Sequence, residues 1–200
     1  MHSQDLPDYF RRKAIGLQWI TIAWMIVECL LSLRAGSKAN SMALLTFSGD
    51  SGVELASAVV VLLRFYRWRI SEKLASRVAA VLLVLLAALT VLGISISLLI
   101  PGSEPKPSLL GIAVLVVAAL IMPWLGRAKR NLANSIQSGA LRADAAQSSL
   151  CAYFSFISLA GIFVNWAFHW PKADLLASAL LLPLILREAW EGWRGAGCAC

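Results

Sequence analysis

Six long apolar runs constrain the fold of this chain more than any other feature of its sequence. A helix needs about 20 apolar residues to cross the roughly 30 Å hydrocarbon core of a bilayer. Because lipid leaves unpaired backbone groups without partners, each run is predicted to be helical. We therefore predict an all-α integral membrane protein, a bundle of six transmembrane helices in a single domain over residues 1–200, with no soluble domain. The predicted spans are about 14–33, 41–63, 78–100, 109–125, 143–168 and 173–189.

The composition favours a membrane environment and argues against a nucleic-acid partner. Hydrophobic residues make up 59% of the chain and charged residues 14%, which is more apolar surface than one soluble core can bury. The net charge is +7, but the basic residues stand between the apolar runs. No zinc finger, stacking platform or base-reading helix accompanies them. We expect the lipid bilayer, and no nucleic acid, as a partner.

The positions of lysine and arginine predict the orientation in the membrane. All but four of these 18 residues fall on one side of the bundle, the exceptions being Arg34, Lys38, Lys106 and Lys172. Because loops rich in lysine and arginine stay in the cytoplasm, we expect a multi-pass protein of the plasma (inner) membrane. Both termini and the longer basic loops would be cytoplasmic. The one-sided set is Arg11, Arg12, Lys13, Arg64, Arg67, Arg69, Lys73, Arg77, Arg127, Lys129, Arg130, Arg142, Arg187 and Arg194.

Two carboxylates lie in the middle of the second apolar run, where charges are costly. Asp50 and Glu54 are about nine residues from either polar boundary, or about 13 Å deep at ~1.5 Å per residue. Being four apart, they project from one face of the helix. Carboxylates at this depth tend to line a water-filled cavity, share a proton or bind a cation. The neighbouring Ser51 allows close helix approach and access of water.

The fifth apolar run supplies a matching polar face. Asp144, Gln147, Ser148 and Cys151 recur at helical spacing, and Cys151 reaches the depth of the two carboxylates. Carboxylate oxygen together with thiolate sulfur suits zinc or a similar divalent ion. The alternative is that Cys151 is simply a small buried apolar residue. A metal pocket between the second and fifth helices is therefore geometrically possible.

One further carboxylate, Glu28, lies in the first apolar run, within the stretch WMIVECLLSL. It is either a proton carrier or orienting partner for the site, or a carboxyl group kept protonated or hydrogen-bonded at a helix interface. We group it with Ser51 and Ser148 as candidates for proton coupling or support. Asp174, near the outer boundary, is expected to cap a helix N-terminus.

These acidic motifs resemble those of the cation diffusion facilitator family of divalent-metal/proton antiporters. The family's acid-Ser-x-x-acid pattern stands at residues 50–54, with Glu54 where the usual second acid is Asp. The Ala-Asp-x-x-His-x-x-x-Asp pattern of its fifth helix stands at residues 143–151, with Gln147 in place of His and Cys151 in place of Asp. Most members also carry a cytoplasmic C-terminal domain, which we do not expect here because only about a dozen residues follow Arg187. The chain therefore resembles the short, transmembrane-only branch.

The resemblance implies efflux of a divalent cation in exchange for protons, at a midplane site between helices 2 and 5. Zinc is the cation that we expect first. No prosthetic group is expected, because the metal is the transported substrate. The metal ligands implied are Asp50, Glu54 and Cys151, with Gln147 or Asp144 assisting. The family also forms homodimers, and the small residues Gly93 and Ser97 on the third run offer a packing face for one.

Other classes of function remain as alternatives. An enzyme is not expected, because the chain has no Gly-x-Ser-x-Gly, no His-Glu-x-x-His and no glycine-rich phosphate loop. A non-transporting membrane scaffold or assembly protein would use the same acids to pair with other subunits. A proton-coupled exporter of another solute would use them for protons alone.

Overall fold

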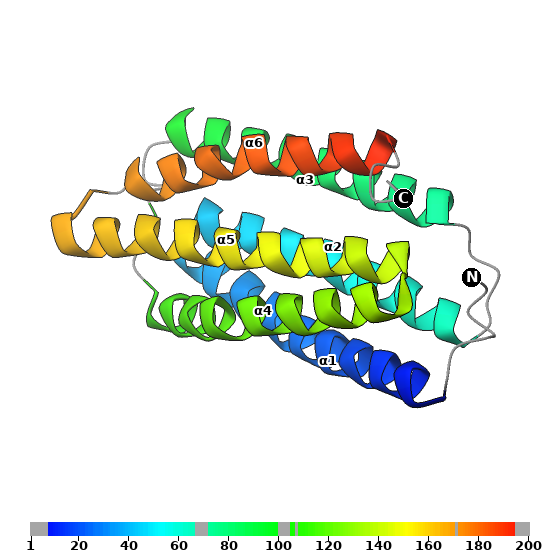
Figure 1. Cartoon of the computed structure of the whole chain (residues 1–200). Coiled ribbons are helices and arrows are strands. Elements are labelled where there is room, and N and C mark those ends of the chain that lie inside the picture. Colours follow the sequence, from blue (N-terminus) through cyan, green and yellow to red (C-terminus); the bar gives the residue numbers. More distant parts are fainter. Residues whose placement is uncertain (1–7, 67–71, 100–104, 107, 171, 195–200) are drawn as a thin grey trace.

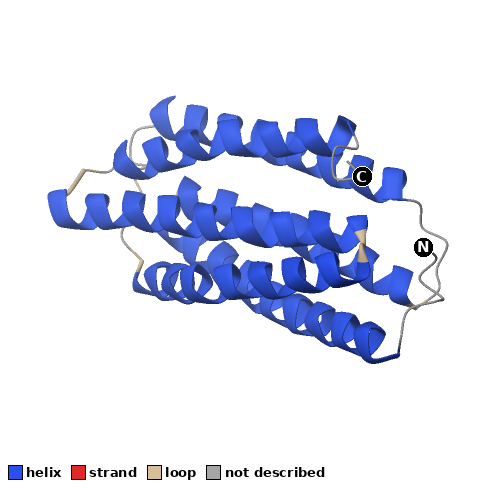
Figure 2. Ribbon diagram, viewed as in Figure 1, coloured by secondary structure: helices blue, strands red, loops and turns tan. Residues whose placement is uncertain are grey.

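The computed structural model describes residues 8–66, 72–99, 105–106, 108–170 and 172–194, and every regular element among them is an α-helix (Figure 2). The all-α fold and the six predicted helical segments are thereby confirmed. Arg67 and Arg69, which we predicted for the cytoplasmic surface, lie outside the described residues. The helices are α1 (Asp8–Ala39), α2 (Met42–Phe65), α3 (Glu72–Leu99), α4 (Leu109–Ile136), α5 (Gly139–Phe168) and α6 (Lys172–Arg194).

Five of these helices, α1 to α5, are long and apolar enough to cross a membrane. The sixth, α6, has 23 residues, which at ~1.5 Å per residue is also enough to cross the hydrocarbon core. It carries charged residues near both ends, including Lys172, Asp174 and Arg194. The chain is therefore an all-α membrane bundle of six helices.

The connection between α4 and α5 differs from our prediction of a basic loop. Helix α4 continues past residue 125 to Ile136, and α5 begins at Gly139, so that only Gln137 and Ser138 separate them. Gln137 takes a left-handed conformation, and its backbone N–H bonds to the carbonyl of Ala133. Ser138 caps α5 by accepting a bond from the Leu141 N–H. These local caps end α4 and begin α5 at a tight turn, well outside the apolar runs.

The helices form two unequal groups that lie side by side (Figure 1). Helices α3 and α6 pair with each other along one side of the bundle, and α1, α2, α4 and α5 pack together on the other. The start of α1 and the end of α6 lie at the same end of the bundle. This arrangement places the first and last described residues on one side of the membrane-spanning region.

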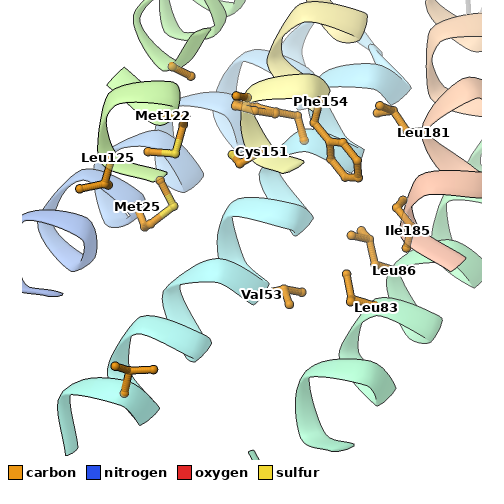
Figure 3. Close-up of a cluster of buried hydrophobic side chains, with 14 of the residues drawn as sticks. Met25, Val53, Leu83, Leu86, Met122, Leu125, Cys151, Phe154, Leu181 and Ile185 are labelled. Atoms are coloured by element: carbon orange, nitrogen blue, oxygen red, sulfur yellow. The ribbon is translucent and has the colours of Figure 1, made fainter. Parts of the chain in front are cut away.

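Large apolar side chains join the two groups (Figure 3). Leu83 and Leu86 of α3 face Val53 of α2, and Leu181 and Ile185 of α6 lie near them in the same core cluster. Burial of such side chains within a membrane protein reflects close packing rather than escape from water. The core therefore fixes α2 and α5 between the α3–α6 pair and the remaining helices.

One small residue of the predicted dimer face is used inside the bundle. A Cβ added at Gly93 would lie 2.1 Å from Cε of Met42 on α2. Gly93 therefore leaves room for the end of the Met42 side chain between α3 and α2.

Candidate functional site

Buried polar side chains gather on the four helices α1, α2, α4 and α5. They form two connected groups within the bundle, joined through Glu54. The first, which we call the carboxylate–thiol group, comprises Glu28, Asp50, Ser51, Glu54 and Cys151. The second, the ion-pair group, comprises Gln18, Glu54, Ser57, Lys129, Asp144 and Ser148.

Glu28 on α1 is held by hydrogen bonds from three helices. Its Oε2 accepts a bond of 2.6 Å from the Trp24 indole N–H, one helical turn earlier. Its Oε1 accepts bonds of 2.6 Å from the Ser51 hydroxyl on α2 and 3.5 Å from the Cys151 thiol on α5. The carboxyl group is wholly buried. Glu28 therefore adjoins the residues predicted for the site, and Ser51 supports it.

Asp50 and Glu54 of α2 are buried, and each keeps one oxygen without a hydrogen-bond partner. Asp50 is 6% exposed and Glu54 2%. Among the described residues, neither Oδ2 of Asp50 nor Oε2 of Glu54 has a partner. Buried polar atoms nearly always have one, so each of these two oxygens is open to a proton, a water molecule or a cation.

Cys151 lies in the apolar core, as expected of a small buried residue, and also beside the carboxylates, as expected of a metal ligand. It is fully buried in the apolar cluster beside Met25 and Met122 (Figure 3). Its side chain also interacts with the carboxyl groups of Asp50 and Glu54, in addition to its bond to Glu28. The thiol thus lies at the boundary between the apolar core and the carboxylates.

The carboxylate–thiol group is not drawn together into a coordination sphere. In the described part of the chain, no cluster of three or more His, Cys, Asp and Glu side chains has an arrangement that could hold a metal ion. Gln147, the weaker predicted ligand, is half-buried, and its Oε1 has no partner. Binding an ion there would require side chains of α2 and α5 to close around it.

Asp144 lies in the ion-pair group, where its carboxyl group is fully occupied. Its Oδ2 is 2.8 Å from Lys129 Nζ and accepts a bond of 2.9 Å from the Gln18 amide. Its Oδ1 accepts a bond of 3.2 Å from the Ser57 hydroxyl. Of the two predicted site residues that lie beside the Lys129 ammonium group, Asp144 is thus the nearer.

Lys129 on α4 is the polar residue that sequence analysis misplaced. We assigned it to a basic cytoplasmic loop, but it is completely buried in the bundle. Its Nζ is 3.6 Å from Oε1 of Glu54 and donates a bond of 2.9 Å to the Ser148 hydroxyl. Ser148 in turn donates to Oε1 of Glu54. Lys129 and Ser148 therefore both contact Glu54, the residue that the two groups share.

The sequence does contain a signal for this burial. Residues facing the core of α4 recur at helical spacing on both sides of position 129, as Met122, Leu125, Leu132 and Ile136 show. Lys129 continues the same face. We missed the burial of Lys129 because the positive-inside rule counts basic residues beyond an apolar run. It does not distinguish those that face water from those that face the bundle.

Asp174 caps a helix, as predicted, but the helix is α2 rather than its own. Its Oδ1 accepts a bond of 2.5 Å from the Ser41 hydroxyl, and its Oδ2 accepts one of 3.2 Å from the Ala43 N–H. Capping in this way satisfies an unpaired donor in the first turn. It also ties the start of α6 to the start of α2, the helix that carries Asp50 and Glu54.

Comparison with protein families gives one match over most of the chain. The model for the cation efflux transmembrane domain matches residues 19–194, from the first half of α1 to the end of α6. Comparison with curated proteins found no match. The matched region contains all the residues of the carboxylate–thiol group.

Proposed function

The chain belongs to the cation efflux family and is a multi-pass membrane protein that exports metal cations, and we propose from this premise that its substrate is zinc, bound between α2 and α5 and exchanged for protons. The ligands are Asp50, Glu54 and Cys151, completed by Gln147. This proposal leaves Asp144 as the partner of Lys129, so that it assists through charge rather than by touching the metal.

The observation that carries the proposal is the pair of open carboxylate oxygens beside a buried thiol. Oδ2 of Asp50 and Oε2 of Glu54 lack partners among the described residues, and both side chains interact with Cys151. An unsatisfied carboxylate inside a membrane costs several kcal/mol. A divalent cation would remove that cost if the side chains close around it, since it would then satisfy both oxygens at once.

The mixture of ligands favours zinc over harder ions. Zinc accepts carboxylate oxygen and thiolate sulfur in tetrahedral sites with four ligands, whereas magnesium and calcium prefer oxygen alone. Two carboxylates and one thiolate provide three ligands of this kind. The open Oε1 of Gln147, four residues before Cys151 and so on the same face of α5, provides the fourth.

Proton exchange follows from the chemistry of the ligands. A metal binds the deprotonated forms of a thiol and a carboxyl group, so protons and metal compete for the site. The Cys151 thiol already donates to Glu28, which makes Glu28 the acceptor for the proton that metal binding releases. Ser51 holds Glu28 in place, and Ser148 does the same for Glu54.

The topology and assembly are part of the same proposal. Helix α6 is the sixth crossing, both termini are cytoplasmic in the plasma (inner) membrane, and the protein works as a homodimer. The even number of helices and the common end of α1 and α6 (Figure 1) support the placement of the termini. The excess of basic residues on that side supports its being cytoplasmic.

A flux assay with the purified protein in liposomes tests this function. Zinc, cadmium, manganese and magnesium are compared with and without an imposed pH gradient, using empty liposomes as the control. We expect zinc uptake that accelerates when protons can leave in the opposite direction. Absence of divalent flux would favour a membrane scaffold, and proton movement without metal would favour export of another solute.

A further inference from the structure

Lys129 is a buried cation inside the region where this protein is proposed to bind another cation. Its ammonium group is completely buried and lies against two carboxylates, at 2.8 Å from Asp144 and 3.6 Å from Glu54. An ammonium ion in a membrane interior is as costly as a carboxylate unless it is paired. The two acids therefore stabilise the lysine, and the lysine stabilises them.

The two contacts are unequal. The shorter one, to Asp144, comes with further hydrogen bonds from Gln18 and Ser57 to the same carboxyl group. The longer one, to Glu54, reaches only Oε1, while Oε2 stays open. Lys129 can therefore lose Glu54 and still keep a fully formed ion pair with Asp144.

We propose that Lys129 is a tethered counter-cation: its ammonium group neutralises both Asp144 and Glu54 when no metal is bound, and the arriving divalent cation takes Glu54 from it and leaves it paired with Asp144 alone. This inference rests on the proposed function and adds to it a residue that sets metal affinity. The lysine remains charged throughout, and no covalent or proton-transfer step is involved.

Two consequences follow for transport. The tethered charge weakens metal binding, because the metal must compete with it for Glu54 and then remains close to it. The same charge speeds metal release, because the ammonium group is ready to take back the carboxylate. Lys129 thus lowers the affinity for metal and raises the turnover of transport. Both effects are expected of a group that stabilises the metal-free state more than the metal-bound state.

The decisive experiment compares two variants whose effects on KM have opposite signs. In Asp144→Asn, the amide keeps hydrogen bonds to Gln18 and Ser57 but no longer pairs with the ammonium group, which then turns fully to Glu54. We expect the KM for zinc to rise about tenfold, since opposite charges about 4 Å apart attract strongly even at protein-surface dielectric. In Lys129→Met combined with Asp144→Asn, the counter-cation is removed and Asp144 is not left as a charged group without its cation, while Glu54 keeps its hydrogen bond from Ser148. The KM is expected to fall about tenfold below wild type, with a reduced kcat.

Lys129→Arg and Arg130→Met serve as matched variants. Lys129→Arg keeps the charge and should keep a KM close to that of wild type if the fold is retained. Arg130 is exposed and donates to Ser149, so Arg130→Met removes a neighbouring positive charge outside the site. Its KM and kcat should match those of wild type. Size-exclusion profiles and zinc titration by calorimetry accompany each flux measurement.

The outcomes separate this inference from the function on which it rests. Wild-type protein that neither binds nor transports a divalent cation overturns both. If wild type transports zinc but the double variant has an unchanged KM, Lys129 has only a structural role and the inference alone fails. A raised KM in Asp144→Asn that persists in the double variant would instead identify Asp144 as a metal ligand.

Discussion

The Cys151 thiol on α5 donates a hydrogen bond to Oε1 of Glu28 on α1, with 3.5 Å between sulfur and oxygen. The same oxygen accepts the Ser51 hydroxyl of α2. Three helices therefore meet at one carboxyl group beside the proposed metal ligands. A rearrangement of any of the three helices would change the environment of the Glu28 carboxyl group. Under the proposed function, this group would therefore couple metal binding to helix movement.

Replacing the thiol should change the preference among metals. We expect Cys151→Ser to weaken zinc and cadmium binding at least about tenfold while affecting manganese much less, because soft ions depend on thiolate. Bound metal measured by elemental analysis of the purified variants checks this. Cys29→Ser is the control, since Cys29 is half-buried and contacts Ser48 rather than the carboxylates. Equal losses for all metals in Cys151→Ser would contradict sulfur ligation.

Removing one charge from α2 should abolish transport and spare the fold. Asp50→Asn keeps the shape of the side chain and loses the anionic oxygen that attracts the cation. We expect zinc flux into liposomes to fall to background, with unchanged helix content by circular dichroism. Glu191→Gln is the matched control, because Glu191 forms an exposed ion pair of 2.8 Å with Arg187, and such pairs contribute about 1 kcal/mol or less. Normal zinc binding by Asp50→Asn would exclude Asp50 as a ligand.

The cap supplied by Asp174 should contribute to stability through its bond with Ser41. Loss of a helix cap costs about 1 kcal/mol, and loss of a hydrogen bond to a charged group costs about 1.5–3 kcal/mol. We therefore expect Asp174→Ala to lower the thermal unfolding temperature in detergent. A double-mutant cycle with Ser41→Ala measures the coupling between the two side chains. Strictly additive effects would show that the 2.5 Å contact contributes nothing of its own.

Close packing of α5 against α6 depends on Gly161. A Cβ there would lie 2.4 Å from the Cβ of Ala177 and 3.1 Å from the carbonyl oxygen of Ala173. Gly161→Ala should therefore separate the two helices and destabilise the protein by about 1–3 kcal/mol, seen as a lower unfolding temperature. Gly16→Ala is the control, because a Cβ there meets nothing within 4 Å. It should be neutral or stabilising by up to ~1 kcal/mol, and equal losses in both variants would refute the packing argument.

The helices were predictable because their cause is local. Each apolar run is long enough for the membrane, and lipid permits only a hydrogen-bonded backbone. The shared face of Asp50 and Glu54 was predictable for the same reason, since four residues return a helix to the same side. The turn at Gln137 and Ser138 was missed because capping and core packing, rather than hydropathy, decide where α4 ends and α5 begins.

By itself, the sequence determined that this chain is a helical membrane bundle, which family its motifs resemble, and which acids lie at membrane depth. Only the tertiary structure decided their partners: Glu28 joins Cys151, Asp144 pairs with Lys129, and Asp174 caps α2. Helical periodicity assigns a side chain to a face, but it does not say which neighbouring helix that face will meet. Because the cost of a buried charge depends on the group opposite it, the chemistry of these residues was settled by packing.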